Sequence, residues 1–161
     1  MTYDAPHGEL SAITRLHDHV PTLERASSSV QFVATGSLTQ DRYGLFRWDM
    51  QPHAGGPKPH FHRTFSEAFY VLAGTVKLYD GRAWLDAGPG DFVHVPEGGI
   101  HAFANESDAP AAMLILFAPG VARERFFTAT AEIANAGREL SPKEWTAFYA
   151  EHDQFMVDAD Q

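Results

Sequence analysis

Two short segments decide the fold of this chain: HFHRTFSE at residues 60–67 and GDFVHVPEGGIH at residues 90–101. In a β-strand, residues i and i+2 point to the same face and lie roughly 6.6 Å apart along the chain. His60 and His62 are therefore spaced so that two imidazoles of one strand can reach the same metal ion, with bonds of about 2.1 Å. The first segment thus predicts a chelating pair on one strand.

Two further side chains are candidates for the same site. A turn over residues 63–66 would let Glu67 open the next strand with its carboxylate facing inward, and His101 follows a second tight turn at the start of another strand. A buried Glu67 without a partner would be costly. Metal binding therefore explains the pattern better than a set of ordinary buried histidines.

Short β-type runs separated by turn residues surround these segments. The run at residues 43–50 alternates, with Phe46 and Trp48 on one face and Arg47 and Asp49 on the other. The remaining runs lie at residues 30–35, 69–72, 75–79, 82–85, 92–95, 101–104 and 113–117. Asp80-Gly81 between two of them is typical of a hairpin turn whose two central positions need positive φ. About eight short strands in roughly ninety residues indicate an all-β barrel or sandwich.

The pattern becomes helical after Gly120. We expect one helix over residues 122–134 and a second that begins at Ser141-Pro-Lys-Glu144, a capping box with proline at the first helical position. The second helix is predicted from an apolar stripe of Trp145, Phe148, Tyr149, His152 and Met156. Both helices are expected to pack on the barrel or on a partner subunit. The predicted division is an N-terminal arm (1–28), a barrel (29–119) and a C-terminal helical extension (120–161).

The composition excludes several classes of protein. Twelve Lys and Arg against 21 Asp and Glu give a net charge of −9, whereas binding to nucleic acid or to an anionic membrane needs clustered positive charge. The chain has no cysteine, which excludes disulfides, thiolate metal sites and cysteine nucleophiles. Its N-terminal region lacks the apolar core of a signal peptide. We therefore expect a cytoplasmic protein, without nucleic-acid or membrane partners, that takes a small-molecule substrate or ligand.

These residues resemble the two motifs of the single-domain cupins, a family of small jelly-roll barrels, and in particular their small bacterial quercetinase-like members. The first motif here is His60-x-His62-x4-Glu67-x6-Gly74, and the second is Gly90-x5-Pro96-x-Gly98-x2-His101-x3-Asn105. All nine positions match within 46 residues, and 15 residues separate the two motifs. The resemblance implies an all-β cupin jelly-roll barrel, here with an N-terminal arm and two C-terminal α-helices.

The resemblance also implies that His60, His62, Glu67 and His101 bind one divalent metal ion inside the barrel. Three neutral imidazoles and one carboxylate suit iron, manganese, nickel, copper or zinc, and the ligand types alone do not choose among them. Four protein ligands on a six-coordinate ion leave two positions for water or substrate. Because cupins often form dimers by exchanging strands or arms, we expect a homodimer.

The expected activity is that of a metal-dependent dioxygenase acting on an enol, a flavonol-like molecule or another small aromatic substrate. Glu67 would be catalytic as the base or hydrogen-bond partner of the substrate hydroxyl. Four aromatic side chains are candidates for an apolar substrate pocket, although they also suit barrel filling: Phe46, Trp48, Phe69 and Phe103. The alternatives are a non-catalytic binding or sensor cupin, and an isomerase or decarboxylase of a sugar or small acid. The last would need charged groups in the pocket.

Overall fold

The structure is a computed structural model that describes residues 2–157. One sheet has six strands, in the order β1 (Thr22–Glu24), β2 (Ser28–Ala34), β3 (Gly44–Met50), β10 (Ala111–Ala118), β5 (Ser66–Ala73) and β8 (Phe92–Val95). A second has three strands, in the order β7 (Trp84–Ala87), β6 (Val76–Tyr79) and β9 (Ala102–Ala104). A short pair joins β4 (His60–Phe61) to β11 (Phe155–Met156). All pairings within the sheets are antiparallel.

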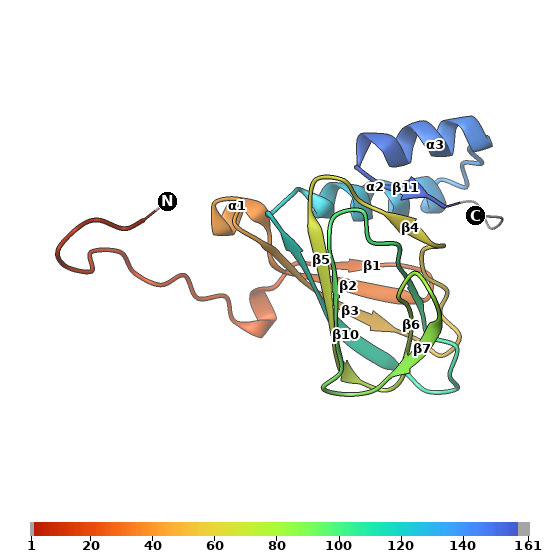
Figure 1. Ribbon diagram of the computed structural model, residues 1–161, viewed down its shortest axis with the longest axis horizontal. Helices are drawn as coiled ribbons and strands as arrows, with labels where there is room; N and C mark the ends of the chain where they lie inside the picture. The colour runs from red at the N-terminus through yellow and green to blue at the C-terminus, as the bar shows by residue number, and fades with distance from the viewer. Residues whose placement is uncertain (1, 158–161) are drawn as a thin grey trace.

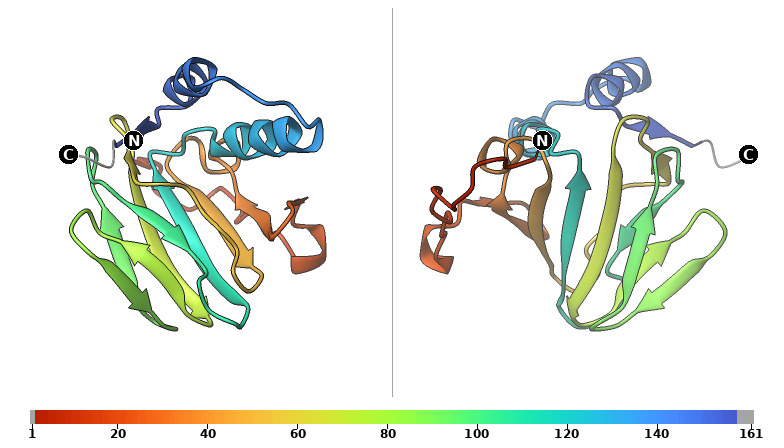
Figure 2. Two further views of the ribbon diagram at one scale, coloured as in Figure 1. Left: turned by 90° about the vertical axis from the view of Figure 1, so that its right-hand side faces the viewer. Right: turned by 60° about the vertical axis from the view of Figure 1, so that its left-hand side comes forward.

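The two larger sheets face each other as the halves of a barrel. They converge at one end and diverge toward the other, where the helices α2 (Arg123–Asn135) and α3 (Pro142–Glu151) lie (Figures 1 and 2). A 3-10 turn η1 (His17–His19) and a single helical turn α1 (Gly36–Thr39) complete the elements. The chain before η1 extends away from the barrel (Figure 1). The expected all-β jelly-roll barrel, with two helices after it, is confirmed.

Each of the eight β-type runs in the sequence forms a strand. Two further short strands had no such run to mark them, β1 and β11. The strand predicted to carry both His60 and His62 is β4, but it ends at Phe61, so His62 lies directly after it. Residues 22–24 fall in the predicted arm, yet as β1 they pair with β2 at the edge of the six-stranded sheet. The division into arm, barrel and extension remains a prediction.

The alternation of β3 determines which of its side chains form the core. Phe46, Trp48 and Met50 are buried, and the intervening residues are only partly buried. The adjacent strand β10 places Met113 opposite Trp48 and Ile115 opposite Phe46, so the two strands continue one apolar surface. Burial of side chains of this size contributes roughly 1.5–3 kcal/mol each. The apolar face of β3 points into the barrel, as the sequence predicts.

Helix α2 closes one end of this core. Its Phe127 packs edge-on against Phe46 and Trp48, with ring centroids 5.4 and 5.2 Å apart. Phe126, also buried, stacks on Phe148 of α3 at 5.8 Å. The predicted helix at residues 122–134 is therefore confirmed within one residue at each end, and it packs on the barrel of its own chain.

The capping box at the start of α3 is present, but the predicted apolar stripe extends too far. Ser141 and Glu144 cap each other reciprocally, with Pro142 in the first turn. The helix ends at Glu151, and Asp153 then adopts a left-handed conformation with φ of 51°. This turn redirects the chain into β11, so Met156 lies on a strand and its assignment to the helical stripe is wrong.

The hairpin between β6 and β7 differs by one residue from the sequence prediction. Tyr79 pairs with Trp84, and the amide of Asp80 donates to the carbonyl of Ala83 at 3.2 Å. The central pair is therefore Gly81-Arg82, with a positive φ of 89° at Gly81. The Asp80 carboxylate instead accepts hydrogen bonds from the backbone amides of Arg82 and Ala83. Asp80-Gly81 marks the hairpin correctly, but not its central pair.

Within residues 2–157, the helices are too short or too polar to cross a membrane.

Candidate metal centre

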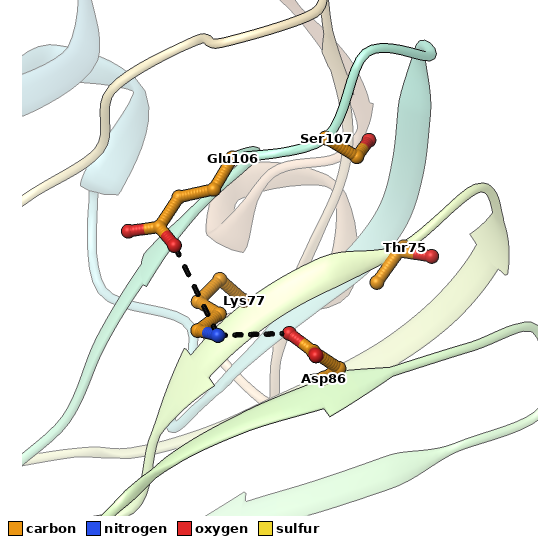
Figure 3. A pocket seen from close by; sticks show the side chains of 5 residues that line it. All are labelled: Thr75, Lys77, Asp86, Glu106 and Ser107. Carbon is orange, nitrogen blue, oxygen red and sulfur yellow. Dashed lines mark ion pairs between the residues drawn. The ribbon is translucent and has the colours of Figure 1, made fainter.

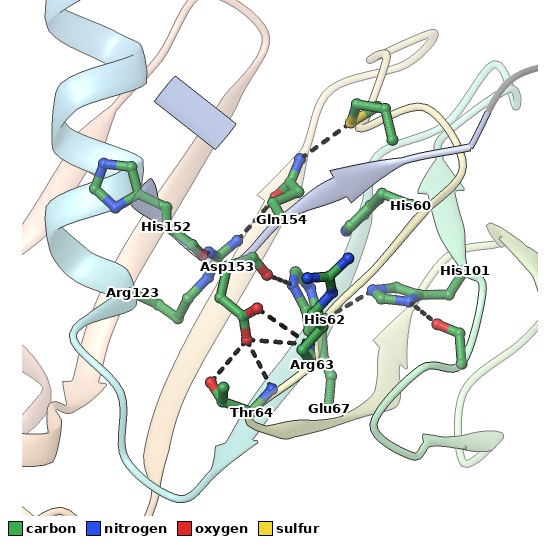
Figure 4. Close-up of polar contacts among 12 residues, drawn as sticks. His60, His62, Arg63, Thr64, Glu67, His101, Arg123, His152, Asp153 and Gln154 are labelled. Atoms are coloured by element: carbon green, nitrogen blue, oxygen red, sulfur yellow. Dashed lines mark hydrogen bonds and ion pairs between the residues drawn. The ribbon is translucent and has the colours of Figure 1, made fainter. Parts of the chain in front are cut away.

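Four side chains from three parts of the chain converge near the end of the barrel where β11 pairs with β4 (Figure 4). His60 lies on β4 and His62 directly after it, Glu67 lies near the start of β5, and His101 immediately precedes β9. One ligand atom from each lies within 4.8 Å of the others. No member of the set is more than 5% exposed. The structure therefore brings together the four residues that the two sequence motifs single out.

Backbone hydrogen bonds between the two motif segments fix this arrangement. His60 and His101 form an antiparallel bridge, in which each amide donates to the other's carbonyl at 3.1 and 2.9 Å. The amide of Gly98 donates to the carbonyl of His62 at 2.7 Å, from a backbone with φ of 80° that favours glycine. The expected turn over residues 63–66 reverses the chain, so that Glu67 faces back into the barrel.

In all three histidines Nδ1 carries a proton and Nε2 faces the site, as in histidines that bind a metal through Nε2. Their Nδ1 atoms lie 2.8 Å from the carbonyl of Lys58 for His60, 2.6 Å from that of Asp153 for His62, and 3.0 Å from that of Gly99 for His101. A carbonyl oxygen only accepts hydrogen bonds, so each Nδ1 carries a proton and donates it. Each Nε2 is then the atom available for a metal, in an orientation fixed by the backbone.

The carboxylate of Glu67 lies among these Nε2 atoms. Its Oε2 is 2.8 Å from Nε2 of His101 and 3.2 Å from Nε2 of His62. Burial would raise the pKa of Glu67, but the charge and hydrogen bond of His101 outweigh it and hold that pKa below its usual range. Burial, together with the charge of His101, lowers the pKa of His60 to about 3. Glu67 is thus ionised and His60 neutral at pH 7, as metal ligands must be.

The residues present fit a divalent transition metal. Nε2 of His62 is buried and makes no hydrogen bond, which is an uncommon state for a buried polar atom. A bound ion would provide the partner that this atom lacks. Three imidazoles and a carboxylate suit iron, manganese, nickel, copper or zinc, and the donor set does not choose among them.

The four predicted pocket residues lie in the barrel interior. Phe69 is closest to the histidines, with its ring 5.9 Å from that of His101, and it contacts Phe103 at 5.7 Å. Phe103 contacts Trp48 at 5.6 Å, whereas Phe46 contacts Phe127 of α2 at 5.4 Å. None of the four is more than 7% exposed. They therefore fill the barrel between the histidines and α2, and their role in substrate binding remains a prediction.

Three polar residues beside the site have no counterpart among the residues singled out from the sequence. Asp153 provides the carbonyl that accepts from His62. Arg123, only 5% exposed, donates to the carbonyl of His152 at 2.9 Å and to Oε1 of Gln154 at 3.1 Å. These residues lie far from both motifs in sequence, so no spacing rule connects them to the histidines. Arg123 at the start of a predicted helix reads as an ordinary surface residue.

A separate surface pocket of about 280 Å³ contains none of the four site residues. Lys77 occupies it, with Nζ 3.1 Å from Asp86 and 3.9 Å from Glu106, beside Thr75 and Ser107 (Figure 3). Because both neighbouring carboxylates already pair with the lysine, this pocket offers no unpaired charge to a ligand.

Comparison with known proteins points to one family. The family model described as "Cupin domain" matches residues 46–117. The quercetin 2,3-dioxygenase of Bacillus subtilis (strain 168) is 33% identical over 57 residues, which cover 32% of this chain and only 17% of that enzyme.

Solved structures agree on the fold. A predicted oxalate decarboxylase from Thermotoga maritima superposes with a TM-score of 0.60 at 16% identity, covering 66% of this chain and 99% of that one. The polyketide cyclase RemF from Streptomyces resistomycificus superposes with a TM-score of 0.57 at 22% identity, covering 66% and 80%. At these identities the similarity concerns the barrel alone.

Proposed function

The chain is a cupin-domain protein, with the domain at residues 46–117, and from this premise we propose that it is a metal-dependent dioxygenase. The metal would be one divalent ion of iron, manganese, nickel, copper or zinc, bound by His60, His62, Glu67 and His101. The substrate would be an enol, a flavonol-like molecule or another small aromatic compound.

The observation that carries the metal site is the common orientation of the three histidine rings. Each donates Nδ1–H to a backbone carbonyl, so each presents Nε2 to the same buried space as the Glu67 carboxylate. A structural hydrogen-bond network would not require three Nε2 atoms and a carboxylate within 4.8 Å of one another. A cation satisfies all four at once.

The similarity to quercetin 2,3-dioxygenase supports the dioxygenase assignment. The polarity of β3 supports an apolar substrate, since Phe46 and Trp48 face inward while Arg47 and Asp49 pair with each other, part-exposed, on the opposite face. An isomerase or decarboxylase of sugars or small acids would need charged groups inside the barrel. The outward orientation of Arg47 and Asp49 therefore counts against that alternative.

The residues of the chain have separate roles in this proposal. A divalent metal, when bound, would lower the pKa of a coordinated hydroxyl, and iron, manganese, nickel or copper, unlike zinc, would also supply a redox-active centre. Oε2 of Glu67, ionised at neutral pH, accepts the hydrogen bond or the proton of the substrate hydroxyl. Phe65 stacks on His62 at 4.2 Å, and Phe69 lies against His101. These rings pack against the faces of two of the three imidazoles.

We further propose that the chain acts as a cytoplasmic homodimer with a small-molecule substrate. The net charge of −9 supports a partner other than nucleic acid or anionic lipid. Tyr70 and Phe92 lie directly opposite each other on β5 and the edge strand β8, 45% and 62% exposed. Adjacent exposed aromatic rings at a sheet edge support contact with a second copy.

Oxygen uptake tests the activity. The metal-free protein is reconstituted separately with Fe(II), Mn(II), Ni(II) and Cu(II) and mixed with quercetin, with His101→Ala as the control. We expect uptake that depends on the metal and is lost in the variant. Protein that contains bound metal but consumes no oxygen with any of the four would contradict the dioxygenase assignment and favour a metal-loaded binding module.

A further inference from the structure

We propose that the C-terminal segment, residues 152–157, is part of the metal site, with Asp153 as the positioning residue of His62. This segment lies outside the cupin domain at residues 46–117. The inference rests on the proposed metal binding and adds a consequence to it: metal binding and docking of the C-terminal segment favour each other.

The hydrogen bond of His62 differs from those of the other two histidines. His60 and His101 donate Nδ1–H to carbonyls only two residues away in the sequence, Lys58 and Gly99. His62 donates to the carbonyl of Asp153, 91 residues away, at 2.6 Å, the shortest of the three distances. Two imidazoles therefore donate Nδ1–H to their own loops, and the third donates it to the C-terminal segment.

Asp153 also organises the turn that separates two of the ligands. Its carboxylate accepts hydrogen bonds from the amides of Arg63 and Thr64, at 3.1 and 2.8 Å, and from the Thr64 hydroxyl at 2.7 Å (Figure 4). Arg63 and Thr64 lie between His62 and Glu67. One residue thus holds the ring of His62 through its carbonyl and the connection to Glu67 through its side chain.

Contacts on both sides of Asp153 hold the C-terminal segment in place. Arg123 donates to the carbonyl of His152 and to the side chain of Gln154. Beyond Gln154, β11 pairs with β4, so that Met156 lies opposite His60, and the amide of Val157 donates to the carbonyl of Pro59 at 3.0 Å. The segment therefore contacts β4, on which His60 lies and which His62 directly follows.

This arrangement predicts that metal binding and docking of the C-terminal segment are coupled. The hydrogen-bond partners of metal-ligating histidines typically change metal affinity 10–100-fold when they are removed. Because coupling between two binding equilibria is reciprocal, a metal that binds the aligned His62 must stabilise the docked segment to the same extent. The positive φ of Asp153, 51°, gives a way to grade the effect, since asparagine adopts this conformation more readily than alanine does.

The first experiment measures Co(II) affinity, by competition with a chelator, and the visible Co(II) spectrum of folded variants. Asp153→Ala keeps the backbone carbonyl, but it removes the carboxylate that holds Arg63 and Thr64 and disfavours the left-handed backbone that aims the carbonyl at His62. We therefore expect it to lower the affinity 10–100-fold and to alter the spectrum. Asp153→Asn should recover most of the loss. The control is Asp91→Ala, which removes a carboxylate that caps a turn at the opposite end of β8 through the amide of Gly88, and it should bind as the wild type does.

A second measurement needs no variant. In the wild type, Co(II) should slow hydrogen exchange at the amides of Arg63, Thr64 and Val157. The first two donate to the Asp153 carboxylate and the third donates to the carbonyl of Pro59, so all three report docking of the C-terminal segment. Asp153→Ala with wild-type affinity, or exchange at these amides that is unaffected by bound Co(II), would overturn this inference alone. A wild type that binds no Co(II) would overturn the proposed metal site as well.

Discussion

Nε2 of His101 lies 2.8 Å from Oε2 of Glu67, and neither residue is more than 5% exposed. Nδ1 of His101 already donates to the carbonyl of Gly99, so the hydrogen bond to Glu67 requires a second proton on the ring. Burial would lower the pKa of His101, but the charge of Glu67 and this hydrogen bond outweigh it and raise the pKa. Without metal, the pair is an imidazolium and a carboxylate.

A metal ion at this site must displace that proton. We expect binding of Zn(II) at pH 7 to release about one proton, and the affinity to fall as the pH is lowered. Calorimetric titrations in two buffers with different ionisation enthalpies measure the release directly. The control is His53→Gln, because His53 is an exposed histidine paired with Asp108. An observed heat that is independent of the buffer would contradict the ion pair.

The metal-free protein should lose stability in acid because of His60. The pKa of His60 is lowered to about 3, from 6.5 in an unfolded chain, so the unfolded state binds more protons between these values. The free energy of unfolding therefore falls as the pH drops from 6.5 toward 3, by up to several kcal/mol at about 1.4 kcal/mol per pKa unit. The lowered pKa of Glu67 acts in the same direction below about 4.5.

Urea unfolding at a series of pH values measures this loss. We expect His60→Gln, whose amide does not titrate, to show a shallower dependence between pH 6.5 and 4.5 than the wild type. Parallel curves for the two proteins would show that the acid sensitivity arises elsewhere.

Bound metal should raise the free energy of unfolding by an amount set by the ratio of its free concentration to its dissociation constant. A ligand at 100 times its dissociation constant adds about 2.7 kcal/mol. For a chain of this size that corresponds to a rise in Tm of roughly 5–10 °C. Glu67→Gln and His101→Ala should abolish the rise, because each removes one of four donors. Calorimetric scans with and without Zn(II) check this, and an equal rise in both variants would place the ion elsewhere.

Local rules made the four residues candidates, and the resemblance to the two cupin motifs assigned them to one metal ion. The period of two along a strand sets His60 and His62, and the turns at residues 63–66 and 96–99 set Glu67 and His101. The inward face of β3 follows from the same period. These features depend on neighbouring residues, and a single sequence contains that information.

The contacts of the C-terminal segment could not be predicted in this way. Asp153 meets His62 across 91 residues, and no periodicity reaches that far. Met156 continues the apolar spacing of α3, but the left-handed turn at Asp153 interrupts the helix. The hairpin at Asp80 was misplaced by one residue because its carboxylate caps the turn from outside the central pair.

Phe127 should be a large contributor to stability. It joins α2 to the barrel through Phe46 and Trp48 and is 6% exposed. Phe127→Ala should lower the free energy of unfolding by about 3–5 kcal/mol. Leu10→Ala, at a position 82% exposed, is the control and should change it by less than about 0.5 kcal/mol. Chemical denaturation of both variants decides whether α2 belongs to the core.

Arg123 offers a way to separate the stability of the barrel from the integrity of the site. Its guanidinium lies 4.1 Å from the ring centroid of Phe126, and burial lowers its pKa to about 10, so it is charged at neutral pH. In Arg123→Met, a thioether of similar length can fill the space among the phenylalanine rings. The backbone carbonyl of His152 and the side-chain oxygen of Gln154 would then lack their hydrogen-bond donor. Each unpaired group would lower the stability of the docked segment by roughly 1–3 kcal/mol while it remains buried.

Undocking of the C-terminal segment relieves that cost, because both groups then reach water. We therefore expect Arg123→Met to keep the cooperative unfolding of the barrel, while Co(II) affinity falls about tenfold as His62 loses its acceptor. Exchange at the amide of Val157 should accelerate, whereas that at the amide of Val71, which donates to the carbonyl of Asp91 just before β8, should not change. Unchanged Co(II) affinity and unchanged exchange at Val157 in this variant would show that Arg123 does not hold the C-terminal segment in place. It would then have no part in orienting His62.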